Sequence, residues 1–124
     1  MILIIGGAYQ GKLAYAQEHL GVKPEQVFTC EKDEVDFSKP CINALEQFTW
    51  ACTQTGVDPT AYFAQHQAQW EDAVLICRDI FCGVVPMDDR ERQWRQDTAR
   101  LCQYLARNAR QVSRMFCGLE QRLK

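Results

Sequence analysis

The sequence has no apolar run long enough to cross a membrane. Its longest such stretch, at the amino terminus, is five or six residues, whereas a spanning helix needs about 20. No basic residue precedes Ile2–Ile5, and the apolar segment is too short for a secretory signal peptide. We therefore expect a cytoplasmic protein with no membrane partner.

Cysteine pairs spaced C-x-x-C are also missing, although the chain has seven cysteines. An odd number of cysteines without an export signal favours reduced thiols that pack as small hydrophobic side chains. This spacing does not favour a zinc site. The cysteines are Cys30, Cys41, Cys52, Cys77, Cys82, Cys102 and Cys117.

The composition is that of an ordinary globular protein. Hydrophobic residues make up 47% of the 124 residues and charged residues 24%, which excludes a disordered tail. The sequence shows no repeat, low-complexity segment or linker. We expect residues 1–124 to form a single domain that needs neither metal nor disulfide to fold.

Charge is distributed unevenly along the chain. Residues 1–77 carry 4 basic and 10 acidic side chains, whereas residues 78–124 carry 10 basic and 6 acidic ones, so that the overall net charge is −2. The basic half would fit a surface facing phosphate or another subunit, or simply a helix with a solvated cationic face. We expect no nucleic-acid partner.

Apolar periodicity predicts strands that alternate with helices, which is the α/β class with a mainly parallel sheet. Strands are expected at residues 2–5, 27–29, 73–77 and 112–117, with a short terminal strand at 119–124. Helices are expected at residues 12–20, 40–55, 59–70 and from Asp88 or Asp89 to about 111, with Ser38 and Asp58 as the caps of the second and third. Loops are expected at 31–36 and at 83–86.

One motif indicates chemistry. The run Gly6-Gly7-Ala8-Tyr9-Gln10-Gly11-Lys12 fits the pattern G-x-x-x-x-G-K between an apolar strand and a helix. In such a loop the backbone N–H groups and the helix N-terminus bind phosphate, and the lysine neutralises the outer phosphates. A glycine-rich turn without a ligand is the alternative. The motif predicts a P-loop NTPase-like three-layer fold, with four to five strands and helices on both faces.

The hydroxyl that normally follows the loop lysine is absent. A Ser or Thr at that position would be a Mg²⁺ ligand, but here the residue is Leu13. Such a loop can still hold phosphate, while Mg²⁺ would be held less well. The nucleotide-binding residues expected from the motif are Gly6, Gly7, Ala8, Tyr9, Gln10, Gly11, Lys12 and Leu13.

Both ends of the chain resemble the bifunctional adenosylcobinamide kinase/adenosylcobinamide-phosphate guanylyltransferases of cobalamin biosynthesis. That family has G-G-A-R-S-G-K-S at the loop, T-N-E-V-G-x-G-I-V-P after a later strand, and then F-R-D-x-x-G-x-x-N-Q-x-L-A on a helix. The corresponding runs here are residues 6–13, 77–86 and 94–106. The resemblance covers roughly the first 20 and the last 50 residues.

The chain departs from that family at several functional positions. The family's N-E pair is Arg78-Asp79, and the aspartate of F-R-D is Gln96. The family's helix D-E-[ML]-x-x-R-I-x-x-H, whose histidine accepts GMP, has no counterpart before His66. The internal strand with D-C-x-[ST] is also expected to be missing. We interpret His19 and His66 as surface or packing residues.

Two further charged residues are candidates for the site. Asp79 follows a strand that should lie beside the loop strand, where it would bind Mg²⁺ or orient a hydroxyl nucleophile; the alternative is a solvated aspartate or an ion pair with Arg78. Arg95 would contact a phosphate, or extend along the Trp94 face as a surface arginine.

The leading hypothesis is a diverged cobinamide-kinase-like protein that transfers a phosphoryl group from ATP or GTP to a hydroxyl. Lys12 and Asp79 would be catalytic, with Mg²⁺ as cofactor. By resemblance, the acceptor would be a cobinamide and the protein a homo-oligomer. Alternatives are a nucleotide-binding or regulatory subunit without turnover, and a protein that binds no nucleotide.

Overall fold

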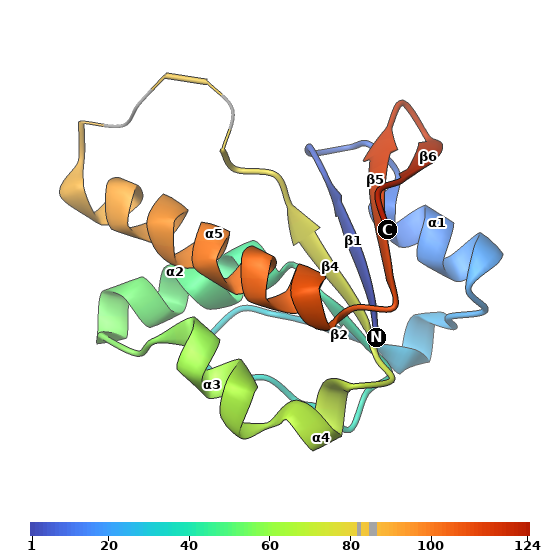
Figure 1. Ribbon diagram of the computed structural model, residues 1–124, viewed down its shortest axis with the longest axis horizontal. Helices are drawn as coiled ribbons and strands as arrows, with labels where there is room; N and C mark the ends of the chain where they lie inside the picture. The colour runs from blue at the N-terminus through green and yellow to red at the C-terminus, as the bar shows by residue number, and fades with distance from the viewer. Residues whose placement is uncertain (82, 85–86) are drawn as a thin grey trace.

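The chain is described by a computed structural model that covers residues 1–81, 83–84 and 87–124. It is an α/β protein with one six-stranded sheet in the order β2-β3-β4-β1-β5-β6 (Figure 1). All neighbouring strands are parallel except β5 and β6. The strands are β1 (Ile2–Gly6), β2 (Val27–Thr29), β3 (Cys41–Asn43), β4 (Val74–Arg78), β5 (Gln111–Phe116) and β6 (Leu119–Arg122).

Helices cover both faces of the sheet, as expected. The helices are α1 (Lys12–His19), α2 (Leu45–Thr55), α3 (Pro59–Gln65), α4 (Gln67–Trp70) and α5 (Asp89–Asn108), with a 3₁₀ turn at Pro24–Gln26. Phe48, Phe63 and Leu101 of α2, α3 and α5 form a core with Leu3 and Leu75 on one face. On the other face a smaller core joins α1 to the sheet through buried residues that include Ile2, Ile4, Ala16, Ile76 and Met115.

The expected helix over residues 40–55 is wrong in its first part. Cys41–Asn43 form a strand that lies between β2 and β4, so the sheet has six strands rather than four or five. Ala44 then adopts a left-handed conformation (φ 61°), which separates β3 from α2. Ser38 is not the cap of α2, because that helix begins after Ala44. The Ser38 hydroxyl instead donates to the Asp36 carboxylate at 2.6 Å. An internal strand is therefore present where we expected none.

The expected helix over residues 59–70 is divided at His66. Asp58 caps its beginning as expected and accepts hydrogen bonds from the N–H groups of Thr60 and Ala61. Trp70 is buried and donates from Nε1 to the Phe63 carbonyl at 2.7 Å. His66 stacks on Phe37 and its Nδ1 lies 2.7 Å from the Tyr62 carbonyl, so it is a packing residue.

The long helix α5 begins as expected and ends about three residues earlier than expected. Asp88 is its cap and accepts from the N–H groups of Arg90 and Glu91. Its buried stripe includes Leu101 and Leu105. The loop expected at 83–86 lies partly outside the described residues, since Val85 and Pro86 are not described; neither is Cys82.

Four of the six described cysteines are buried, namely Cys30, Cys41, Cys52 and Cys77. Burial raises the pKa of Cys30 and Cys52 to about 12 and that of Cys41 to about 11. These thiols therefore remain neutral at physiological pH and pack as apolar side chains. None of the described helices combines the length and apolarity that a membrane crossing requires.

Gly6 is required where β1 passes β5. A Cβ at this position would lie 2.7 Å from the Met115 carbonyl oxygen, a contact with backbone that cannot move aside cheaply. We predict that Gly6→Ala lowers the free energy of unfolding by about 1–3 kcal/mol, measured by urea denaturation, because it overpacks the centre of the sheet. Gly7→Ala is the control, since its nearest neighbour would be Gln10 Cγ at 3.6 Å. Equal stability of the two variants would contradict the prediction.

Candidate functional site

The glycine-rich motif forms the turn between β1 and α1. Tyr9 has a left-handed backbone (φ 59°) and an exposed side chain, and Gly11 (φ 91°) is the N-cap of α1. Because Gly11 has no side chain, it leaves the first N–H groups of the helix without a side-chain acceptor. A hollow of about 240 Å³ adjoins this turn and is lined by Tyr9, Gln10, Gly11, Lys12, Leu13, Ala14 and Asn43. The turn thus combines a helix N-terminus with an open surface, which is suited to an anion.

The β5–β6 hairpin holds the loop in place. The side-chain oxygen of Gln10 accepts from the Cys117 N–H at 2.6 Å, and the backbone carbonyl of Gln10 accepts from the Gly118 N–H at 3.2 Å. A Cβ on Gly11 would lie 3.4 Å from the Gly118 Cα, so loop and hairpin turn are in close contact. The conformation of the loop therefore depends on a segment more than one hundred residues away in the sequence.

Lys12 turns back over the loop. Its ammonium group donates to the Gly7 carbonyl at 2.6 Å. Partial burial lowers the pKa of Lys12 below its ordinary value, and the positive charge of Arg78 acts in the same direction. The negative charges of Glu46 and Asp79 oppose this effect. Lys12 therefore lies within electrostatic range of groups from β4 and α2.

Asp79 lies where the sequence predicts, beside the beginning of the loop. β1 and β4 are parallel neighbours with Gly6 opposite Arg78, and the Asp79 N–H donates to the Gly6 carbonyl at 2.8 Å. The Asp79 carboxylate accepts from the Phe81 N–H at 3.0 Å. Its side chain is thus at the carboxyl edge of the two central strands, where ligands bind in open parallel sheets.

Sequence reasoning missed Glu46. This residue lies in the first turn of α2 and is only 7% exposed. Its Oε1 accepts from the Arg78 N–H at 2.9 Å, one residue before Asp79. The only signal in the sequence is an acidic residue between the buried Leu45 and Phe48. The incorrect helix over 40–55 concealed that Glu46 lies three residues after the end of a strand. The site therefore has two carboxylates near one ammonium group.

Leu13 has a structural role. It is half-buried and packs against the core under α1.

Arg95 is half-buried on α5 beside Trp94, whose Nε1 donates to the Glu46 carbonyl at 2.9 Å. The contact of Arg95 with a phosphate stays a prediction.

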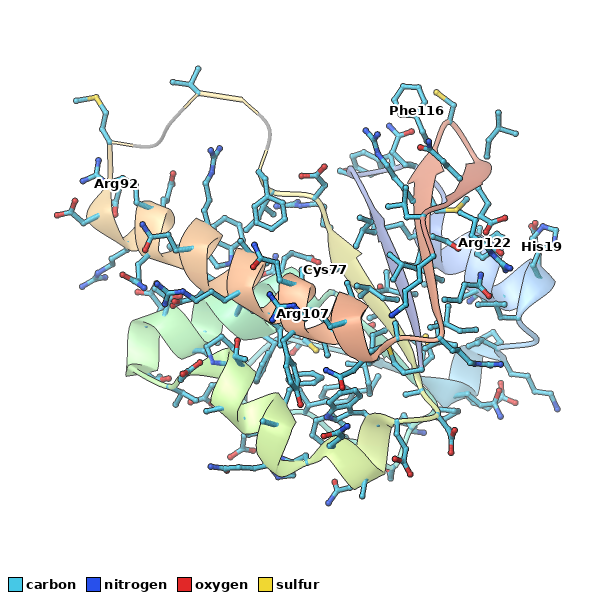
Figure 2. All side chains as sticks on the ribbon, in the orientation of Figure 1. His19, Cys77, Arg92, Arg107, Phe116 and Arg122 are labelled. Carbon is cyan, nitrogen blue, oxygen red and sulfur yellow. The ribbon has the colours of Figure 1, made fainter. Side chains whose placement is uncertain are left out.

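The two histidines lie in other parts of the fold. His19 is exposed at the end of α1 (Figure 2). His66 belongs to the aromatic packing near α3. Within residues 1–81, 83–84 and 87–124, no three His, Cys, Asp or Glu side chains converge in the way that a protein metal site requires. Carboxylate oxygens such as those of Asp79 and Glu46 are nevertheless the ligands that Mg²⁺ prefers.

No family model matches the chain, and no curated protein matches it either.

The surroundings of Lys12 predict that its pKa is lowered, and this shift can be measured. Because burial disfavours the ammonium form, the pKa in the folded chain should lie below 10.5. Protonation of Lys12 therefore opposes folding, and this penalty should disappear as the pH rises through the folded pKa toward 10.5. Glu46→Gln should lower the pKa further, since Glu46 is the strongest of the charges that raise it.

Side-chain NMR of Lys12, assigned with Lys12→Arg, measures this shift. Glu18→Gln is the control, because Glu18 is an exposed residue of α1 that does not act on the Lys12 pKa. An unchanged Lys12 pKa in Glu46→Gln would show that the two groups are not electrostatically coupled.

Proposed function

We propose that this chain is a diverged P-loop, cobinamide-kinase-like protein that binds ATP or GTP at Gly6–Leu13. The observation that supports the proposal most directly is the position of Lys12. Its ammonium group lies over a glycine-rich turn at the amino end of a helix, at the carboxyl edge of a parallel sheet. A nucleotide phosphate bound there would be an acceptor for the loop N–H groups and for Lys12.

The proposed reaction is transfer of the γ-phosphoryl group to a hydroxyl. The hydroxyl oxygen attacks the γ-phosphorus, and the bond to the oxygen that bridges the β- and γ-phosphates breaks. Lys12 would neutralise the negative charge that develops on the phosphates. Asp79 or Glu46 would accept the hydroxyl proton. By resemblance to the family, the hydroxyl would be that of a cobinamide.

Because position 13 has no hydroxyl, Mg²⁺ would bind to the other oxygen ligands of the site. Leu13 offers none, while Asp79 contributes a carboxylate beside the loop. When bound, the ion would neutralise charge on the β- and γ-phosphates.

The alternative proposal is a nucleotide-binding subunit without turnover. Leu13 supports it, because the side chain at the metal-ligand position is apolar, half-buried and packed against the core. The placement of both histidines also supports it, since neither provides a nucleophile for guanylyl transfer near the loop. Guanylyltransferase activity is therefore not part of the leading proposal.

Thermal denaturation with ATP or GTP, with and without Mg²⁺, tests nucleotide binding. A nucleotide at about 100 times its Kd should stabilise the protein by about 2.7 kcal/mol. Lys12→Ala should lose most of this effect, whereas the exposed Lys32→Ala should retain it. If no nucleotide stabilises the wild-type chain, the binding proposal is wrong.

A coupled assay of nucleotide consumption with a cobinamide distinguishes the two proposals. We expect slow turnover that increases in Leu13→Ser, because the new hydroxyl is a Mg²⁺ ligand. Leu13→Ala is the control, since it removes the same leucine without adding a hydroxyl. Nucleotide binding without turnover in either the wild type or Leu13→Ser would favour the subunit proposal.

A further inference from the structure

The strand β6 forms one edge of the sheet, and its residues Leu119–Arg122 are all exposed. It follows β5 through a two-residue turn, Cys117 (φ 53°) and Gly118 (φ 76°). Figure 2 shows Phe116 near this turn and Arg122 on the outer strand. An exposed edge presents backbone donors and acceptors that another strand can use.

The hairpin register determines which backbone groups face outward. Phe116 is opposite Leu119 and Arg114 is opposite Gln121, and the Leu123 N–H donates to the Val112 carbonyl at 2.8 Å. In an antiparallel pair the hydrogen-bonded positions alternate. The N–H and C=O groups of Glu120 and Arg122 therefore point away from β5, toward the free edge.

We propose that β6 pairs antiparallel with β6 of a second copy of this chain, around a two-fold axis at Gln121. In this register Glu120 lies opposite Arg122 of the partner subunit, and Arg122 lies opposite the partner's Glu120. Both residues have outward-facing backbone groups, so each such pair can exchange two backbone hydrogen bonds. Within one chain Arg122 Nε lies 3.6 Å from Glu120 Oε1, and in the pair each of these side chains also faces the opposite charge on the partner subunit's strand.

Other registers are less favourable. An axis at Glu120 places two glutamates opposite each other, and an axis at Arg122 places two arginines opposite each other. An axis between residues would oppose outward-facing backbone groups to inward-facing ones, so the ladder could not form. Hydrogen bonding therefore requires an axis at a residue, and charge favours Gln121 over Glu120 and Arg122 as that residue.

The apolar side chains of the hairpin agree with this register. Leu119 and Leu123 are on the same face of the strand as Phe116 and Val112, and the exposed fractions of Leu119, Leu123 and Phe116 are 73%, 54% and 61%. The two-fold pairing places Leu119 opposite Leu123 of the partner subunit. Leu123 also lines an apolar hollow of about 330 Å³ between α5 and the sheet. Pairing would therefore bury part of Leu119 and Leu123 of each chain, on either side of the central Gln121.

The charge pattern allows a complementation experiment. Glu120→Arg places a second positive charge opposite Arg122 of the partner subunit, and Arg122→Glu places a second negative charge opposite the partner's Glu120, so each variant repels its own copies. A mixture of the two variants restores attraction, because in the heterodimer two positive charges on one strand face two negative charges on the other. Sedimentation equilibrium should show a wild-type dimer, a dimer Kd at least about tenfold weaker for each variant alone, and recovery in the mixture.

Two controls distinguish an effect on pairing at the β6 edge from a general effect of charge and from misfolding. Glu31→Arg makes the same change of charge near β2, at the opposite edge of the sheet, and should leave the dimer unchanged. Circular dichroism tests the fold of both variants, because each removes the ion pair between Glu120 and Arg122 within one chain, and Glu120→Arg also removes the hydrogen bond from the Ser113 hydroxyl at 2.8 Å. The proposal is overturned by a monomeric wild type, by variants that dimerise as strongly as the wild type, or by folded variants that do not complement each other.

Discussion

The close passage of β1 beside β5 determines the geometry of the candidate site. At Gly6 a Cβ would lie 2.7 Å from the Met115 carbonyl oxygen, so any other residue at this position would force β1 and β5 to shift relative to each other. The same Gly6 accepts the Asp79 N–H, which fixes the residue after β4 next to the beginning of the loop. The glycine-rich turn and the Asp79 carboxylate are therefore both positioned at the Gly6 end of β1.

Lys12 and Glu46 illustrate how a second strand completes the site. Lys12 is provided by the helix after β1, whereas Glu46 is provided by the helix after β3. Glu46 is held by the Arg78 N–H, so its buried carboxylate has a hydrogen-bond donor in place of water. Its negative charge partly offsets the effect of burial on the Lys12 ammonium group. The electrostatic character of the site thus depends on three separate strand ends.

Much of this arrangement could be predicted from the sequence. The loop, the helix caps Asp58 and Asp88, and the position of Asp79 follow from local chemistry and from the parallel order of strands. The strand Cys41–Asn43 could not be predicted in this way, because Ile42, Leu45, Phe48 and Cys52 are also spaced as in a helix and three residues are too few to show a period of two. The break at Ala44 depends on a left-handed conformation that alanine seldom adopts, and Glu46 was missed for the same reason.

The β5–β6 hairpin connects the candidate site to the proposed dimer. Its turn holds Gln10 of the loop through two hydrogen bonds to the backbone N–H groups of Cys117 and Gly118, while its outer strand presents the free edge. Pairing of two hairpins would restrict the movement of each turn, because β6 would then have partners on both sides. The loop conformation would be stabilised at the same time, since the turn is one of its supports. For the anion binding proposed above, such support would be favourable, because a preorganised loop loses less conformational entropy on binding.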